Sequence, residues 1–170
     1  KVLFISGPAA TDAVTGANKY TFRSGRQTYQ DVKTAATFLK GVGKKVTVFA
    51  QDSAFGVGNY AAVNSIVGSQ GHNVGRMLVP LSAQDFTPFA QQVKQANPDL
   101  LFVAWAGTTA PAMWRALEQQ GAFGVSNKIT TGLAERSTWS TQMWLRLNKC
   151  GTSNYSSKRS LGSYGCLRPI

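Results

Sequence analysis

The sequence predicts an α/β fold in which a doubly wound, mostly parallel sheet carries helices on both faces. Apolar runs rich in β-branched and aromatic residues alternate with segments whose apolar residues recur at helical spacing. The expected strands follow one another at intervals of about 27 residues, which suits strand–helix–strand units with right-handed crossovers: 46–51, 74–80, 100–105 and 128–132. The run at 100–105 is almost wholly apolar, as in a central parallel strand covered on both faces.

The elements before this repeat are shorter. Residues 1–7 are expected to form a strand, and residues 7–12 a turn that leads into a short helix. Residues 20–24 form a second extended segment. From Thr28 to Lys40, apolar residues recur at helical intervals and predict a helix that Gly41 ends.

Helices are also expected between the repeated strands. One covers about residues 86–96 and ends at Asn97-Pro98, because the residue before a proline disfavours the helical conformation. Another begins at Pro111, which suits a first helical turn, and Gly121 ends it.

The stretch from Lys45 to Tyr60 joins a strand, a polar loop, two glycines and a helix, which is how α/β sheets form the mouth of a binding cleft. The Gly56-x-Gly58 turn is either a phosphate or dinucleotide cradle, or part of one wall of a small-molecule cleft. In the dinucleotide fingerprint the first glycine follows the strand directly, and an acidic residue comes about 20 residues later. Here residues 52–55 intervene and that acid is missing, so glycines that ease a tight turn and a close helix start are the better interpretation.

The net charge of +11 raises nucleic acid as a partner, but the distribution of charge argues against it. Residues 1–136 contain 13 basic and 7 acidic residues, a net charge of +6, whereas residues 137–170 contain 5 basic residues and no acid. The basic residues of the first part are scattered and form no stripe that could follow a phosphate backbone. We therefore expect a solvated basic surface and no nucleic-acid partner.

An apolar fraction of 43% predicts a globular domain, and no run approaches the roughly 18 apolar residues of a membrane span. Residues 1–7 are too short for a signal peptide, and a chain that opens in a strand suggests a fragment. The basic tail at 140–170 loses the apolar periodicity. It is interpreted either as an irregular terminus or as a segment foreign to the domain.

Catalytic and metal chemistry find little support. The single histidine, His72, lies in a Gly-His-Asn turn and is expected to be exposed. Cys150 and Cys166 fall in the tail, where they could form one disulfide, and no Cys/His set has metal-ligand spacing. Asp52 suits loop bracing and Asp85 a helix start. We expect no enzymatic activity, no metal and no cofactor.

Recognition of a small solute fits the residues better. Phe55, Trp105, Thr108 and Glu135 fall at or just after expected strand ends. An aromatic wall with hydroxyl groups and one carboxylate suits a small organic or zwitterionic ligand. Core packing is the alternative: it is equally favoured for Trp105, and less so for Phe55, which is expected in a polar loop.

Six short segments, in this order and spacing, resemble one family: ISGPAAT (5–11), YTFR (20–23), YQD (29–31), QDSAFG (51–56), DF (85–86) and NPDLLFVAW (97–105). The resemblance covers residues 1 to about 139. It is to the type-I periplasmic substrate-binding proteins of ABC transporters, in the branched-chain amino acid (Leu/Ile/Val) receptor group. Proteins of this family have two α/β lobes joined by hinge strands, and the ligand is trapped when the lobes close.

The resemblance implies a domain division and a set of binding residues. Residues 1–24 would be the end of the first lobe and a hinge segment, residues 25–139 the second lobe, and residues 140–170 a tail outside it. The implied ligand-binding residues are Ala9, Ala10, Thr11, Phe55, Trp105, Gly107, Thr108 and Glu135. The first three match the segment that grips the ligand's α-carboxylate and ammonium groups.

Two departures leave the ligand open. Glu135 only approximates the acid that meets an ammonium group, and Phe55 stands where a tyrosine is common. The ligand is therefore an amino acid, an aromatic acid, an amide or another small organic solute.

By the same resemblance, the chain would belong to an extracytoplasmic solute receptor that passes its ligand to an ABC transporter permease, its only link to the membrane. Ligand capture would occur by hinge closure. The alternative is a nucleotide- or phosphate-binding enzyme fragment that uses the Gly56-x-Gly58 turn. Because most of the first lobe is missing from this chain, we expect half a cleft, which binds ligand weakly or not at all by itself.

Overall fold

The computed structural model describes residues 2–7, 9–126 and 128–131. Its centre is a four-stranded sheet with the strand order β4–β3–β5–β6. The strands are β3 (Lys45–Gln51), β4 (Asn73–Val79), β5 (Leu100–Ala104) and β6 (Ile129–Thr131). Each neighbouring pair is parallel, which confirms the expected α/β class with a parallel sheet.

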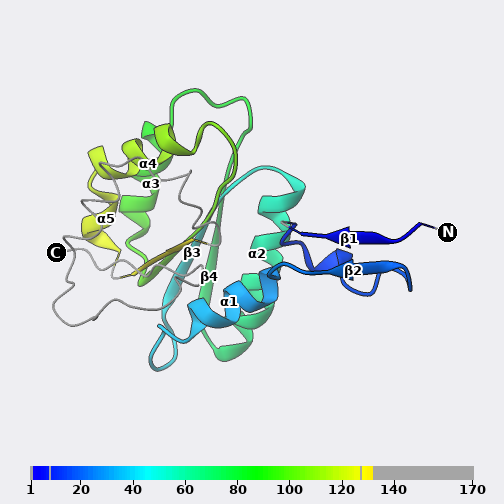
Figure 1. The fold of residues 1–170 in the computed structure, drawn as a ribbon. Coiled ribbons are helices and arrows are strands. Elements are labelled where there is room, and N and C mark those ends of the chain that lie inside the picture. The colour runs from blue at the N-terminus through cyan, green and yellow to red at the C-terminus, as the bar shows by residue number, and fades with distance from the viewer. Residues whose placement is uncertain (1, 8, 127, 132–170) are drawn as a thin grey trace, which may run out of the picture.

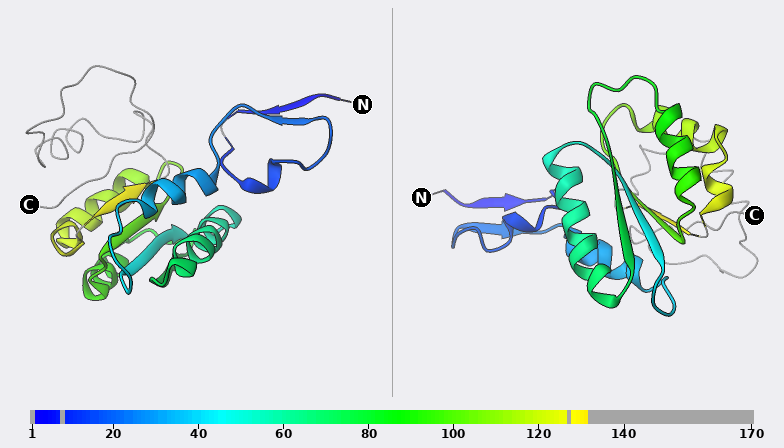
Figure 2. Two further views of the ribbon diagram at one scale, coloured as in Figure 1. Left: turned by 90° about the horizontal axis from the view of Figure 1, so that it is seen from below. Right: turned by 180° about the vertical axis from the view of Figure 1, so that it is seen from behind.

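Helices cover both faces of this sheet (Figures 1 and 2). One face carries α1 (Thr28–Ala36) and α2 (Ala54–Ile66), and the other carries α3 (Thr87–Ala96), α4 (Ala110–Gln119) and α5 (Ala122–Val125). Side chains alternate along a strand, so Phe102 of β5 packs into the core beneath α1 and α2, while Val103 packs into the core beneath α3 to α5. Both faces of β5 are therefore buried, which explains its wholly apolar sequence.

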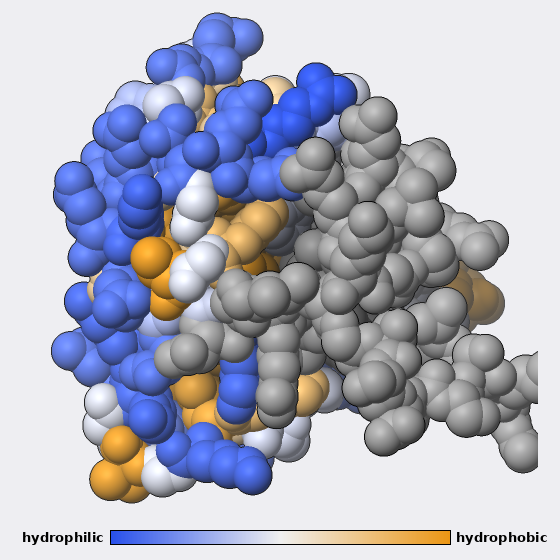
Figure 3. Space-filling view, turned by 90° about the vertical axis from the view of Figure 1, so that its left-hand side faces the viewer, coloured by the Kyte–Doolittle hydropathy of each residue, from blue (hydrophilic) through white to orange (hydrophobic). Residues whose placement is uncertain are grey.

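The outward surface of α3 is mostly polar, whereas α2 exposes Ala54, Val57 and Ala61. Figure 3 views the side that carries α5, where hydrophilic residues cover most of the described surface and apolar residues show between them. None of the helices in the described ranges is both long enough and apolar enough to cross a bilayer.

The direction of winding reverses between β3 and β5. The chain passes from β3 to β4 at one edge, then crosses back to place β5 on the other side of β3. The carboxyl ends of β3 and β5 thus form a topological switch point, where α/β sheets bind their ligands. The backbone N–H of Ala106 donates to Oε1 of Gln51 (3.1 Å), which ties these two strand ends together.

A two-stranded parallel ribbon of β1 (Phe4–Ser6) and β2 (Thr21–Arg23) projects away from the sheet (Figures 1 and 2). A short 3-10 helix, η1 (Asp12–Val14), lies between its strands in sequence. Phe4 and Ile5 point to opposite faces and are 55% and 60% exposed, and Phe22 is 54% exposed. The ribbon therefore lacks the cover that parallel strands have on both faces.

Two expected boundaries and one expected exposure are wrong. Helix α1 ends at Ala36, because the N–H groups of residues 37–39 bond to carbonyls three residues back and tighten the chain. Residues 54 and 55 belong to α2 and not to a loop. His72, between the 3-10 helix η2 (Gly68–Gln70) and β4, is buried, and its Nδ1 accepts from the Lys44 N–H (3.3 Å).

Candidate functional site

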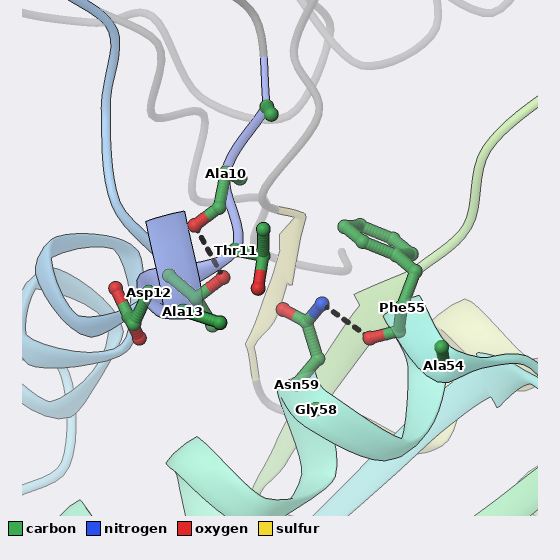
Figure 4. A pocket seen from close by; sticks show the side chains of 10 residues that line it. Ala10, Thr11, Asp12, Ala13, Ala54, Phe55, Gly58 and Asn59 are labelled. Carbon is green, nitrogen blue, oxygen red and sulfur yellow. Dashed lines mark hydrogen bonds between the residues drawn. The ribbon is translucent and has the colours of Figure 1, made fainter. Parts of the chain in front are cut away.

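A pocket of about 500 Å³ lies beside the carboxyl end of β3, between the segment around η1 and the first turns of α2 (Figure 4). Its lining residues are Ala9, Ala10, Thr11, Asp12, Ala13, Thr28, Ala54, Phe55, Gly58 and Asn59. The fold thus brings four residues predicted from the sequence, namely Ala9, Ala10, Thr11 and Phe55, to one pocket. Their contact with a ligand stays a prediction.

The pocket wall formed by residues 9–11 is held in place by hydrogen bonds to its backbone carbonyl oxygens. The guanidinium of Arg23, on β2, donates to the carbonyls of Ala9 and Thr11. The N–H and Oγ1 of Thr28, at the start of α1, both donate to the carbonyl of Ala10 (2.8 and 2.9 Å). Because three consecutive carbonyls are bonded, this wall has a fixed shape.

Asp12 lines the pocket, but its carboxylate is used elsewhere. Both carboxylate oxygens accept from the backbone N–H of Tyr29 (3.3 and 3.2 Å). An acid at that place complements the unpaired N–H groups at the start of helix α1. Figure 4 shows the carboxylate pointing away from Thr11, so Asp12 does not present its acid group to a ligand in the pocket.

The opposite wall is the first two turns of α2. Ser53 caps this helix, since its Oγ accepts from the Gly56 N–H (3.2 Å). Asp52 anchors the turn by donating its N–H to the carbonyl of Val79 (2.7 Å). Phe55 is half-buried in the first helical turn, and its ring faces the Ala10–Thr11 segment across the pocket (Figure 4).

Gly56 serves packing and not phosphate binding. A Cβ at this position would lie 1.8 Å from the carbonyl oxygen of Gln51, so only glycine lets α2 approach β3 this closely. A Cβ at Gly58 would meet nothing within 4 Å. Both glycines lie within the helix, so the expected tight turn is wrong, whereas the expected close helix start is confirmed at Gly56. Neither finding supports the phosphate cradle.

Asn59 is a pocket residue that the sequence analysis missed. It is 4% exposed, and its Nδ2 donates to the carbonyl of Phe55 one helical turn earlier (2.8 Å). The signal available in the sequence was its spacing: positions i and i+4 share a helical face, so Asn59 follows the aromatic residue already predicted to face the cleft.

Trp105, Gly107 and Thr108 are not among the residues that line the pocket. Trp105 is buried, stacks on Phe49 (centroids 5.5 Å apart) and meets Phe86 edge to face (5.3 Å). The core-packing alternative therefore describes its environment. Gly107, with φ of +88°, and the exposed Thr108 lie in the turn between β5 and α4, beside the switch point.

Among the described residues, the acidic candidates form no further site. Glu135, Cys150 and Cys166 lie outside the described residues. Asp85 precedes α3, as expected for a helix start, and the N–H of Thr87 donates to its Oδ1 (2.9 Å), which lowers the pKa of that carboxyl. In the described part of the chain, no three His, Cys, Asp or Glu side chains are grouped to hold a metal ion.

With this geometry in place, comparison with known proteins identifies a family. The model of the "Periplasmic binding protein" family matches residues 1–142. Functionally curated proteins give no match.

Several solved structures have the same fold. A periplasmic binding protein from Burkholderia mallei is 27% identical, with a TM-score of 0.62, and the match covers 73% of this chain and 34% of that one. A solute-binding protein of an ABC transporter from Rhodopseudomonas palustris, in complex with 4-hydroxybenzoate, is 25% identical, with a TM-score of 0.60 and coverage of 71% and 34%.

A leucine-, isoleucine-, valine-, threonine- and alanine-binding protein from Brucella ovis, in its closed conformation, is 23% identical. Its TM-score is 0.62, and the match covers 71% of this chain and 33% of that one. This chain thus matches about a third of the length of these three proteins.

Proposed function

Because this chain belongs to the periplasmic binding protein family, we propose that it is part of the extracytoplasmic solute-binding component of an ABC transporter and forms one half of its ligand cleft. The observation that carries this proposal is the pocket between the 9–13 segment and α2, at the carboxyl end of β3. Its residues come from the segment between β1 and β2 and from α1 and α2, so a ligand there would contact two parts of the fold at once.

The bare ribbon supports the proposal of a second lobe. Phe4, Ile5 and Phe22 are more than half exposed although they lie on parallel strands, which occur almost only in sheets covered on both faces. A first lobe built around β1 and β2 would provide that cover and a further wall of the pocket. Closure of the two lobes would then bury the ligand.

The lining favours a small solute with an apolar body. Alanines and the Phe55 ring supply most of the described wall, while Thr11 and Asn59 supply polar groups. Such a lining suits an aromatic acid or an apolar amino acid. The match to a relative in complex with 4-hydroxybenzoate supports the first class, and the amino-acid receptor resemblance supports the second.

Titration of the isotope-labelled chain with 4-hydroxybenzoate and with L-leucine tests the proposal. One of them should shift the amide signals of Thr11, Phe55 and Asn59 saturably, in the millimolar range expected of half a cleft. Phe55→Ala should abolish these shifts. Phe89 lies on α3 and packs on the other face of the sheet, so Phe89→Ala should leave them unchanged. Shifts that ignore Phe55 would count against the pocket, and saturable micromolar binding of NAD or ATP would favour the enzyme alternative.

A further inference from the structure

We propose that Asn59 contacts the ligand and selects molecules that present an O–H or N–H donor, an inference that rests on the proposed function. Asn59 lines the pocket on α2, one turn after Phe55, and its side chain is almost fully buried. A buried amide has two polar ends, and each needs a partner.

The orientation of the amide follows from its one hydrogen bond. Nδ2 lies 2.8 Å from the carbonyl oxygen of Phe55. Since a carbonyl oxygen can only accept, the nitrogen must face it, and the O and N assignment is fixed by the network. Oδ1 is then the end that points into the pocket, toward Thr11 (Figure 4).

Oδ1 has no donor of its own. Within the described residues, no hydrogen bond reaches this oxygen, and Asn59 has no further interaction there. Among the described residues, the side-chain atoms that are fully enclosed without a partner are Ser126 Oγ and Thr130 Oγ1, so Oδ1 of Asn59 remains accessible from the pocket. A ligand that covers Oδ1 would cut it off from water, and a hydroxyl, amide or ammonium group of that ligand would restore the lost hydrogen bond. A methyl or ether group of the same size would leave the oxygen unpaired.

Phe55 adds a second requirement for the ligand. The Phe55 ring lies on the same helical face as Asn59 and offers a surface to an aromatic or branched aliphatic body. The ligand is therefore a small apolar molecule with a hydrogen-bond donor on the α2 side, such as a phenol or an amine.

Phenol and anisole isolate this effect, because they share an aromatic body and only phenol has a donor. Both are titrated into the full chain, and the side-chain amide signals of Asn59 are followed by NMR. We expect phenol to bind about five-fold more tightly than anisole, the ratio that one net hydrogen bond gives. In Asn59→Leu the two probes should bind equally.

Two further variants guard the interpretation. Asn64→Leu makes the same substitution at an exposed position of the same helix and should retain the preference for phenol. Asn59→Ser serves as the second variant if Asn59→Leu does not fold. Its hydroxyl can bond the Phe55 carbonyl, so the helix should stay intact while the preference for phenol is lost.

The outcomes separate this inference from the proposed function. Equal binding of phenol and anisole to the unmodified chain, no binding of either, or a preference that persists in both Asn59 variants would overturn the role of Asn59. A phenol preference that depends on Asn59 would support it even if neither 4-hydroxybenzoate nor L-leucine binds. Binding of one of those solutes that is indifferent to Asn59 would retain the receptor and reject the selection by Asn59.

Discussion

Gly56 of α2 lies against the carbonyl oxygen of Gln51 at the end of β3, where a Cβ would stand only 1.8 Å from that oxygen. Real Cβ atoms do not approach a backbone carbonyl this closely. The start of α2 can therefore pack on β3 only with glycine at this position, and this packing places Phe55 and Asn59 in the pocket wall.

Gly56→Ala should destabilise the domain by about 3 kcal/mol, because the added methyl group must push the helix away from the strand. Gly58→Ala is the matched control, two residues later in the same helix. A Cβ there meets nothing within 4 Å, and alanine is the better helix former by about 1 kcal/mol. Urea unfolding followed by circular dichroism measures both changes. Equal effects of the two substitutions would contradict the packing role of Gly56.

Asp85 should contribute a pH-dependent part of the stability. The Thr87 N–H donates to its carboxylate, which lowers the pKa of Asp85 from its ordinary value of 3.8. A carboxyl whose pKa is lower in the folded state stabilises the fold above the unfolded pKa, and this contribution disappears as the pH falls through the folded pKa. The stability difference between the unmodified chain and Asp85→Asn should be constant above about pH 5 and shrink below pH 3.8.

Urea unfolding of the unmodified chain and of Asp85→Asn, repeated at a series of pH values from about 2.5 to about 7, measures this difference. Gln84→Asn, a neutral change at the neighbouring exposed position, is the control, and its curves should run parallel to those of the unmodified chain. A difference for Asp85→Asn that does not vary with pH would refute the assignment.

The fold was predictable because its signals are local. The apolar run at 100–105 and the regular spacing of strands depend on neighbouring residues, and they gave a parallel α/β sheet without any knowledge of contacts. The early end of α1 was not predictable in this way. Its periodicity continues to Leu39, but the N–H groups there bond three residues back.

The site was predictable only in part. The family resemblance placed Phe55 and the Ala9–Thr11 segment on the cleft, and these residues do meet at one pocket. Trp105 lies at a strand end, as many ligand-facing residues do, yet Phe49 and Phe86 enclose it. Asn59 is polar in a helix, which usually means a solvated position, and only the tertiary packing of α2 buries it.

Arg23 should act as a positioning residue for the pocket wall. Its guanidinium bonds to the carbonyls of Ala9 and Thr11 and, through Nε, to Oγ1 of Thr15 (3.0 Å). Arg23→Met removes these donors. The amide of Thr15, which bonds to the carbonyl of Asp12, should then exchange with solvent about tenfold faster, since lost hydrogen bonds to a charged group ease local opening.

Native-state hydrogen exchange checks this effect, with the Phe49 amide of the sheet as an internal reference that should not change. Arg23→Lys should restore part of the protection, because an ammonium group can reach one carbonyl but not both. Arg115→Met, at an exposed position of α4, is the control. If the sheet amides accelerate as much as that of Thr15, Arg23 stabilises the whole domain and does not hold the wall.

The β1–β2 ribbon should make this chain self-associate. Ile5 pairs with Phe22 across the ribbon, and both side chains are more than half exposed. Exposed apolar edge strands are templates for pairing with another chain. Replacing both residues with threonine keeps the β propensity of the strands and removes the apolar side chains, so self-association should weaken at least about tenfold.

Sedimentation velocity over a concentration series measures the change. Leu81→Thr, which alters a residue 64% exposed in the loop after β4, should leave the association unchanged. An unmodified chain that stays monomeric at every concentration would show that the ribbon needs no cover.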